Sequence, residues 1–185
     1  LWMQVRLAHV GLRPISALVD LTNYIMAELG QPMHAFDAAK VERIEVAWAK
    51  EGERFRTLDD IERTLSSSTL MIQSRGRSIA VAGIMGGHDT EVSPTTISLL
   101  LESANFGPSA VRKVAVALGL RTDASARFEK SQDPANTTTA IRRFIHLART
   151  EYPDLKLTSR LSDCYPKPAA KISVNVDLRR VARTV

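Results

Sequence analysis

Apolar side chains recur every three or four residues early in the chain, which predicts an amphipathic helix over residues 14–29. Pro14 suits the first turn of this helix, and Gly30 suits the position just after its end. Asp20 and Asn23 fall outside the apolar stripe, so we expect both on the side turned away from the core.

The pattern changes after this helix. Residues 30–37 combine glycine, proline, histidine, phenylalanine and aspartate, and we expect them to form a loop. From Ile44 the period becomes two, which predicts a half-buried strand whose apolar face carries Ile44, Val46 and Trp48.

Short strands separated by turn residues follow. One hairpin is predicted from residues 55–57 and 62–65, and a second from residues 70–72 and 79–81, with Gly76 in its turn. A further apolar strand over residues 97–101 ends at a carboxylate, Glu102. This spacing indicates an antiparallel or mixed sheet.

Helical patterns return in the second half of the chain. We expect one helix over 108–118 and another over 134–151 that is capped by Asp133, with an irregular polar segment over 121–130 between them. Farther on we expect an edge strand within 155–163, a strand over 172–176 and a helix after Asp177.

These elements define an α+β fold with a mixed, largely antiparallel and partly barrel-like sheet and flanking helices. We expect the pocket between the sheet and the first helix. Residues 1–168 are predicted to form one domain, and residues 169–185 the start of the next.

Composition narrows the class of protein. The 185 residues contain 44% apolar residues and no apolar run of about 18, so no membrane span is expected. Cys164 is the only cysteine, which excludes an internal disulfide and suits a reducing, cytoplasmic setting. The net charge of +5 is compatible with nucleic acid. Without an initiator methionine, the chain resembles an internal piece of a longer protein.

Candidate chemistry is sparse before any family is considered. No Ser-His-Asp order, zinc pattern or dinucleotide fingerprint occurs, and His34 with Asp37 or His88 with Asp89 makes a poor metal site. His34 is either a site residue or a hydrogen-bonded structural one. The glycine-rich run 82–87 is either a tight turn or a close approach to a ligand. Glu102 either enters solvent or faces a site.

Seven motifs follow one another over about residues 1–165. They are Gly11-Leu12-Arg13-Pro14-Ile15, Val19-Asp20-Leu21-Thr22-Asn23-Tyr24, Gly30-Gln31-Pro32-Met33-His34-Ala35-Phe36-Asp37, Ala82-Gly83-Ile84-Met85-Gly86-Gly87, Leu101-Glu102-Ser103-Ala104-Asn105-Phe106, Leu118-Gly119-Leu120-Arg121-Thr122-Asp123-Ala124-Ser125, and Arg127-Phe128-Glu129-Lys130 before Asp133-Pro134. Together they closely resemble the central editing domain of the bacterial-type phenylalanyl-tRNA synthetase β subunit. One departure is Ser131-Gln132, where the family more often has a glycine-containing pair.

The resemblance implies hydrolysis of tyrosine wrongly attached to the phenylalanine tRNA. It implies that His34 and Asn23 lie beside the reacting ester, with His34 as base or only as positioner of a water. It also implies the substrate-binding residues Glu102, which recognises the tyrosine hydroxyl, Gly86 and Gly87 in the pocket wall, and Thr122 and Ala124 at its edge.

The resemblance further implies partners and cofactors. The partners are the phenylalanine tRNA and a synthetase α subunit, in a heterotetramer of two α and two β chains. Hydrolysis needs no metal or cofactor, whereas the whole synthetase uses ATP and Mg. Basic residues expected to contact tRNA are Arg112, Lys113, Arg121, Arg127 and Lys130. The alternative function is a non-catalytic tRNA-binding or scaffold domain of the same subunit, in which Arg142 and Arg143 would also contact phosphate.

Overall fold

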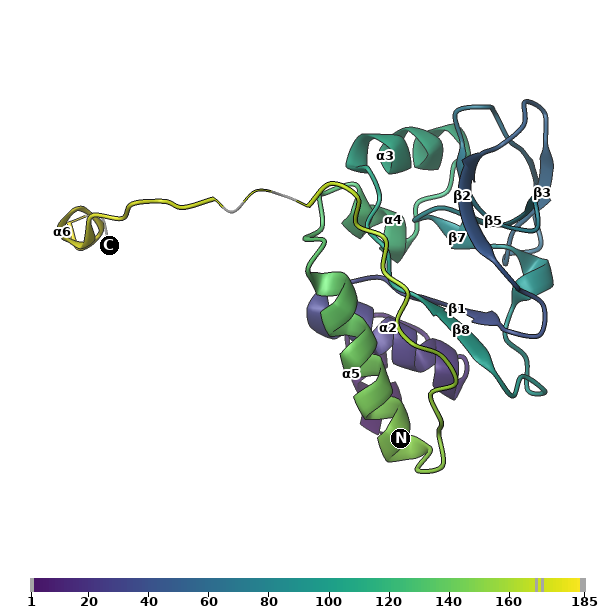
Figure 1. Ribbon diagram of the computed structural model, residues 1–185, viewed down its shortest axis with the longest axis horizontal. Coiled ribbons are helices and arrows are strands. Elements are labelled where there is room, and N and C mark those ends of the chain that lie inside the picture. The colour runs from purple at the N-terminus through teal and green to yellow at the C-terminus, as the bar shows by residue number, and fades with distance from the viewer. Residues whose placement is uncertain (1, 169, 171, 184–185) are drawn as a thin grey trace. The chain divides into compact units, whose positions relative to one another are not determined.

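Figure 1 shows the computed structural model of the chain, in which residues 2–168, 170 and 172–183 are described. The largest sheet is antiparallel, in the strand order β2-β5-β6-β7. Its strands are β2 (Ile44–Trp48), β5 (Leu70–Ser74), β6 (Arg77–Val81) and β7 (Met85–Gly86). The predicted hairpin between β5 and β6 is confirmed.

Two further antiparallel ribbons complete the strand content. One pairs β3 (Arg54–Arg56) with β4 (Glu62–Thr64), and the other pairs β1 (His34–Asp37) with β8 (Leu99–Glu102). In Figure 1 the β1–β8 ribbon lies below the larger sheet and beside a helix. The α+β prediction with antiparallel sheets and flanking helices is confirmed. Within the described residues the strands form separate sheets and close no barrel.

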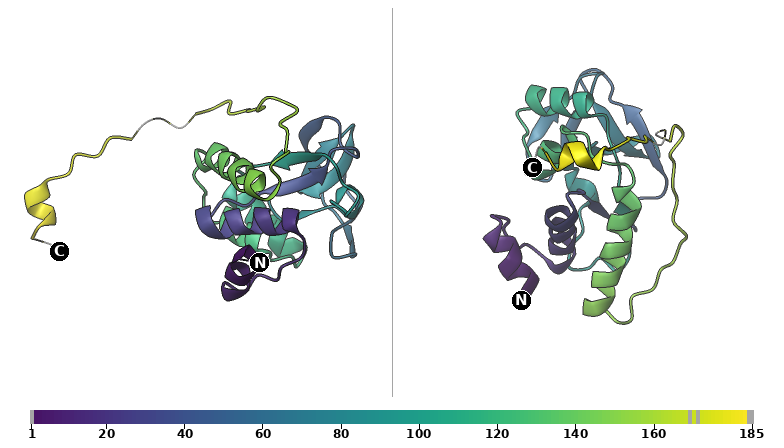
Figure 2. Two further views of the ribbon diagram at one scale, coloured as in Figure 1. Left: turned by 90° about the horizontal axis from the view of Figure 1, so that it is seen from below. Right: turned by 90° about the vertical axis from the view of Figure 1, so that its left-hand side faces the viewer.

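The helices fall into two groups. The first consists of α1 (Trp2–His9), α2 (Ala17–Leu29) and α5 (Asn136–Glu151), in which α2 packs between the other two helices (Figure 2) and also contacts β1. The second consists of α3 (Pro108–Ala117) and α4 (Asp123–Phe128), whose apolar side chains join those of β5 and β6 in the main core. A short 3-10 helix, η1 (His88–Thr90), follows β7. No helix among the described residues is long and apolar enough to cross a membrane.

The first predicted helix is confirmed, but its start and its polar side were wrong. It begins at Ala17 after the N-cap Ser16, because Asp20 accepts a hydrogen bond of 2.8 Å from the Ile15 N–H and holds the preceding turn. Asp20 is therefore buried. Since α1, α5 and β1 all contact α2, this helix has more than one buried side.

The loop prediction for residues 30–37 was wrong at its end, where His34–Asp37 forms β1. Four residues carry little strand signal by themselves. Their ladder partner, β8, lies far along the chain, so only the tertiary fold could supply it.

Strand β2 forms as predicted, but its apolar face is exposed rather than buried. Val46 and Trp48 are each 57% exposed, and Ile44 is exposed as well. Strand β2 is the edge of its sheet. The side chains that cover Ile72 on the neighbouring strand β5 therefore do not cover the apolar face of β2.

The segment 121–130, predicted to be irregular, contains α4, which is started by a capping box between Thr122 and Ser125. Helix α5 begins two residues later than predicted. Asp133 accepts from the Ala135 N–H at 2.9 Å and shapes the turn before the helix, so it is not the helix cap.

The end of the chain differs from prediction. Residues 155–163 and 172–176 form no strand. The expected helix after Asp177 is present as α6 (Leu178–Val181), and the Asp177 carboxylate accepts from the Arg179 N–H at 2.9 Å. By contacts the chain divides into two units, Leu1–Asp154 and Leu155–Val185. The proposed domain boundary near residue 168 stays a prediction.

Candidate functional site

Two predicted site residues meet on the β1–β8 ribbon. His34 and Glu102 are direct cross-strand partners at the end of this antiparallel ladder. Side chains of directly opposed residues share one face, with Cβ atoms about 5 Å apart. The ribbon therefore brings together an imidazole and a carboxyl group that are widely separated in the sequence.

The His34 ring is tightly enclosed. It meets the Phe36 ring edge to face, with centroids 4.4 Å apart and an interplanar angle of 71°. A Cβ atom added to Gly86 would lie 2.5 Å from Cε1 and 2.8 Å from Nε2 of His34, so a side chain at this position would require the imidazole to move. The Nε2 atom is buried and has no hydrogen-bond partner among the residues that the structure describes. Such an atom points to a ligand or water that completes its bonding.

Burial shifts the two ionisable groups in opposite directions. It lowers the pKa of His34 to about 4, because the charged imidazolium is poorly solvated there. Burial raises the pKa of Glu102 to about 7, because the carboxylate is disfavoured. Within the described part of the chain, no hydrogen bond or ion pair joins the two side chains. At neutral pH the site thus presents a neutral imidazole opposite a carboxyl group near its titration midpoint.

The loop between β3 and β4 forms a wall of this site, which the sequence did not reveal. The Leu58 N–H donates to the Gly86 carbonyl at 3.1 Å, and the Leu58 side chain lies 3.1 Å from where a Gly86 Cβ would be. Thr57 forms an isolated bridge with Gly87. Leu58 lies at the tip of a predicted hairpin, and the local sequence pattern does not predict which residues that tip contacts.

The remaining pocket candidates have mainly supporting contacts. A Cβ at Gly87 would lie 2.7 Å from both the Ile79 carbonyl oxygen and the Phe55 ring. The Thr122 hydroxyl donates to the Ile84 carbonyl at 2.9 Å and accepts from the Ser125 N–H at 3.1 Å. Thr122 thus anchors α4 to the segment that leads into β7. Ala124 is half-buried and packs against the main core.

Asn23 lies on α2, the helix that packs beside β1, and its side chain is half-buried. No hydrogen bond joins Asn23 to His34 among the residues that the structure describes. No group of three metal-ligating side chains occurs in this described set either.

The basic candidates differ in how freely they can reach a partner. Arg121 pairs with Glu129 at 3.2 Å and Arg127 with Asp123 at 3.1 Å. The others are exposed and form no ion pair with any described residue; they are Arg112, Lys113 and Lys130. Arg143 is not free for phosphate, because it binds Glu28 through two 2.7 Å hydrogen bonds that tie α5 to α2.

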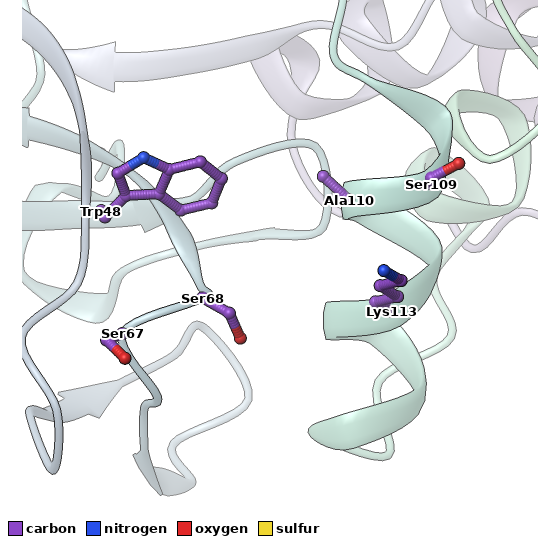
Figure 3. Close-up of a pocket in the computed structure, with 6 residues that line it drawn as sticks. All are labelled: Trp48, Ser67, Ser68, Ser109, Ala110 and Lys113. Atoms are coloured by element: carbon purple, nitrogen blue, oxygen red, sulfur yellow. The ribbon is translucent and has the colours of Figure 1, made fainter.

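Lys113 lines a separate pocket of about 410 Å³ between β2 and α3 (Figure 3). The exposed Trp48 ring lies on one side and Lys113 on the other. The lining residues are Trp48, Ser67, Ser68, Ser109, Ala110 and Lys113. None of them belongs to the set around His34 and Glu102.

The family model described as "B3/4 domain" matches residues 1–151, and the chain belongs to this family. Its curated relatives are phenylalanine–tRNA ligase β subunits, as the sequence motifs predicted.

Three relatives illustrate the similarity. The chain is 50% identical to the phenylalanine–tRNA ligase β subunit of Solibacter usitatus over 165 residues, which are 88% of this chain and 22% of the relative. It is 53% identical to that of Bacillus cereus over 143 residues (76% and 18%), and 45% identical to that of Syntrophus aciditrophicus over 183 residues (97% and 23%). The chain therefore spans about a fifth of the length of these relatives.

Proposed function

We propose that this chain is an editing module of a phenylalanine–tRNA ligase β subunit. It hydrolyses the ester that joins tyrosine to the phenylalanine tRNA, and it leaves correctly attached phenylalanine intact. The observation that carries this proposal is the opposition of His34 and Glu102 across the β1–β8 ladder, with the unpartnered Nε2 of His34 against Gly86.

Selectivity in this proposal rests on Glu102. Tyrosine differs from phenylalanine by one hydroxyl group, and an apolar pocket discriminates poorly against such an addition. A carboxyl group with a pKa near 7 accepts a hydrogen bond from the phenol as a carboxylate, and in its protonated form it still accepts one through its carbonyl oxygen. With phenylalanine bound, the half-buried Glu102 lacks this partner, at a penalty of about 1–3 kcal/mol.

Hydrolysis in this proposal rests on His34. Burial keeps the imidazole neutral at physiological pH, because it holds the pKa near 4. A neutral imidazole accepts a hydrogen bond from a water molecule and orients it towards the ester carbonyl. The low pKa makes His34 a weak base, which favours water positioning over full proton abstraction. Asn23, on the adjacent helix, then orients the ester or the water.

The proposal also specifies partners. The substrate is aminoacylated phenylalanine tRNA, and the other subunit is a synthetase α chain in an assembly of two α and two β subunits. The exposed Arg112, Lys113 and Lys130 are proposed contacts to tRNA phosphates. ATP and Mg serve the aminoacylation reaction of the whole ligase, and the hydrolysis proposed here uses neither.

A deacylation assay tests the proposal. Phenylalanine tRNA carrying radiolabelled tyrosine or phenylalanine is incubated with the chain, and ester loss is followed over time. We expect His34→Ala to slow tyrosine release by at least about tenfold with little change in tRNA affinity. We expect Glu102→Ala to impair tyrosine release while phenylalanine release stays negligible.

Matched controls are His146→Ala on α5 and Glu91→Ala, which replace exposed residues outside β1 and β8. Both should retain wild-type rates. Equal rates for wild type, His34→Ala and Glu102→Ala would contradict the assignment. If tRNA still bound with wild-type affinity, the alternative of a non-catalytic tRNA-binding or scaffold domain would replace it.

A further inference from the structure

Gln31, which precedes the His34 strand, is a fully buried polar residue. It lies between the α2 C-cap Gly30, with φ of 74°, and Pro32. A buried carboxamide is destabilising unless its polar atoms are hydrogen-bonded, so its contacts identify what it does.

The backbone hydrogen bonding of the β1–β8 ladder stops next to Gln31, at Pro32. In the observed register His34 opposes Glu102, and the same register places Pro32 opposite Ala104. At the other end of the ribbon the Ala38 N–H donates to the Ser98 carbonyl at 3.0 Å, which makes the alternate pairs 38/98, 36/100, 34/102 and 32/104 the hydrogen-bonded type. Pro32 has no N–H group, so it cannot donate to Ala104.

The Gln31 side chain supplies the missing donor. Its Nε2 donates to the Ala104 carbonyl at 2.8 Å and to the Pro32 carbonyl at 3.0 Å. The two amide hydrogens thus join the carbonyls of both strands, at the position where a backbone hydrogen bond would otherwise join them.

We propose that Gln31 is a positioning residue, which extends the ladder past Pro32 and keeps His34 opposite Glu102. His34 and Glu102 form the last backbone pair of the ribbon, and terminal pairs are the first to open. The Gln31 bridge converts this terminal pair into an internal one. The catalytic meaning of this role rests on the proposed function, whereas the geometric role does not.

The chain offers a substitution that removes only the donors. Gln31→Met keeps the length of the side chain and removes the amide hydrogens, and Oε1 has no hydrogen-bond partner to lose within the described part of the chain. Pro32→Ala restores a backbone N–H that can donate to Ala104. The double variant Gln31→Met/Pro32→Ala therefore tests whether a backbone bond can replace the side-chain bridge.

The readout is the titration of His34 and Glu102, followed by NMR in the chain itself. In Gln31→Met we expect the pKa of His34 to rise towards its ordinary value and that of Glu102 to fall, because an open ladder end admits water. In the double variant we expect both values to return towards those of wild type. The kcat of deacylation should fall about tenfold in Gln31→Met, with a smaller change in KM. The kcat should recover in the double variant.

Gln73→Met is the matched control, since Gln73 is a half-buried glutamine on β5 whose Nε2 donates to Ser78 at 3.4 Å. It should leave both titrations unchanged. Unchanged titrations in a folded Gln31→Met variant, or no recovery in the double variant, would overturn the proposal. If Gln31→Met fails to fold, the double variant decides the question. A folded double variant with wild-type titrations of His34 and Glu102 supports the proposal, and an unfolded double variant overturns it. A wild-type chain without deacylase activity would contradict the proposed function alone.

Discussion

At the scale of single residues, the contact between Gly86 and His34 is the most restrictive in the site. A Cβ at Gly86 would fall 2.5 Å from His34 Cε1, well inside van der Waals contact. The backbone φ of Gly86 is not in the left-handed region, so any effect of adding a methyl group is steric. Gly86 is thus a direct probe of how closely the imidazole must sit.

We expect Gly86→Ala to destabilise the chain by about 1–3 kcal/mol and to abolish deacylation by displacing the His34 ring. Thermal unfolding and the tyrosyl-tRNA assay measure the two effects. Gly107→Ala is the control, because its Cβ would meet nothing within 4 Å and its φ is negative. A stable and fully active Gly86→Ala variant would show that the ring has room to move.

Glu102 makes a second prediction at this scale, through its raised pKa. A carboxyl group whose folded pKa is raised favours folding below its unfolded pKa, near 4.5, and loses that contribution as pH rises through about 7. We therefore expect Glu102→Gln to gain stability relative to wild type above pH 7, by up to about 3 kcal/mol, and to gain none near pH 4.5. Chemical denaturation at about pH 4.5 and about pH 8 measures the difference; parallel stability curves for the two proteins would contradict it.

At the scale of elements, the β5–β6 hairpin shows how much a local pattern can specify. Arg75 and Gly76 form its two-residue turn, with φ of 51° and 70°. Positive φ at both positions defines a type I′ turn, which favours Asn-Gly. The glycine was a clear signal in the sequence, whereas the arginine occupies a conformation that costs it energy.

We expect Arg75→Asn to stabilise the chain by about 0.5 kcal/mol, measured as a rise in the thermal midpoint. The substitution also removes an exposed ion pair with Glu42, which contributes little. Glu42→Gln removes the same ion pair and keeps the turn, so it serves as the control. A lower midpoint for Arg75→Asn than for Glu42→Gln would contradict the turn argument.

The elements that sequence reasoning missed share a cause. Strand β1 has only four residues and depends on β8 for its hydrogen bonds. Helix α4 has six residues and depends on the Thr122 capping box and on the core contact of Phe128. Short elements lack the repeated pattern that makes a long helix such as α5 readable, because their stability comes from tertiary partners.

At the scale of the whole molecule, Trp48 and Lys113 offer an aromatic surface and a cation across one pocket (Figure 3). Single-stranded nucleic acid is bound by this combination, through stacking of a base and pairing with a phosphate. The exposure of Trp48 on an edge strand makes its ring available to a partner. The pocket lining contains neither His34 nor Glu102, so substitutions there test the proposed tRNA contact without changing the residues of the proposed hydrolysis.

We expect Trp48→Ala to weaken tRNA binding by about 1–3 kcal/mol. We expect Lys113→Ala to lower the salt dependence of tRNA affinity by the amount that corresponds to about one phosphate contact. Filter binding at several salt concentrations measures both. Val46→Ala changes another exposed apolar residue of β2 outside the pocket and should have no effect. Unchanged affinity in both pocket variants would remove this surface from the proposed tRNA path.

The amino-acid sequence was sufficient to predict the α+β class, most of the longer elements, the family and the candidate residues His34 and Glu102. Long helices, hairpin turns and ordered motifs are local signals, and they can be read from consecutive residues. The folded structure was needed to show that His34 and Glu102 oppose each other, that Gly86 lies against the imidazole with Leu58 beside it, and that Gln31 bridges the ladder at Pro32. Those facts depend on the register between segments distant in the chain, which hydrogen bonding and burial select in the folded state.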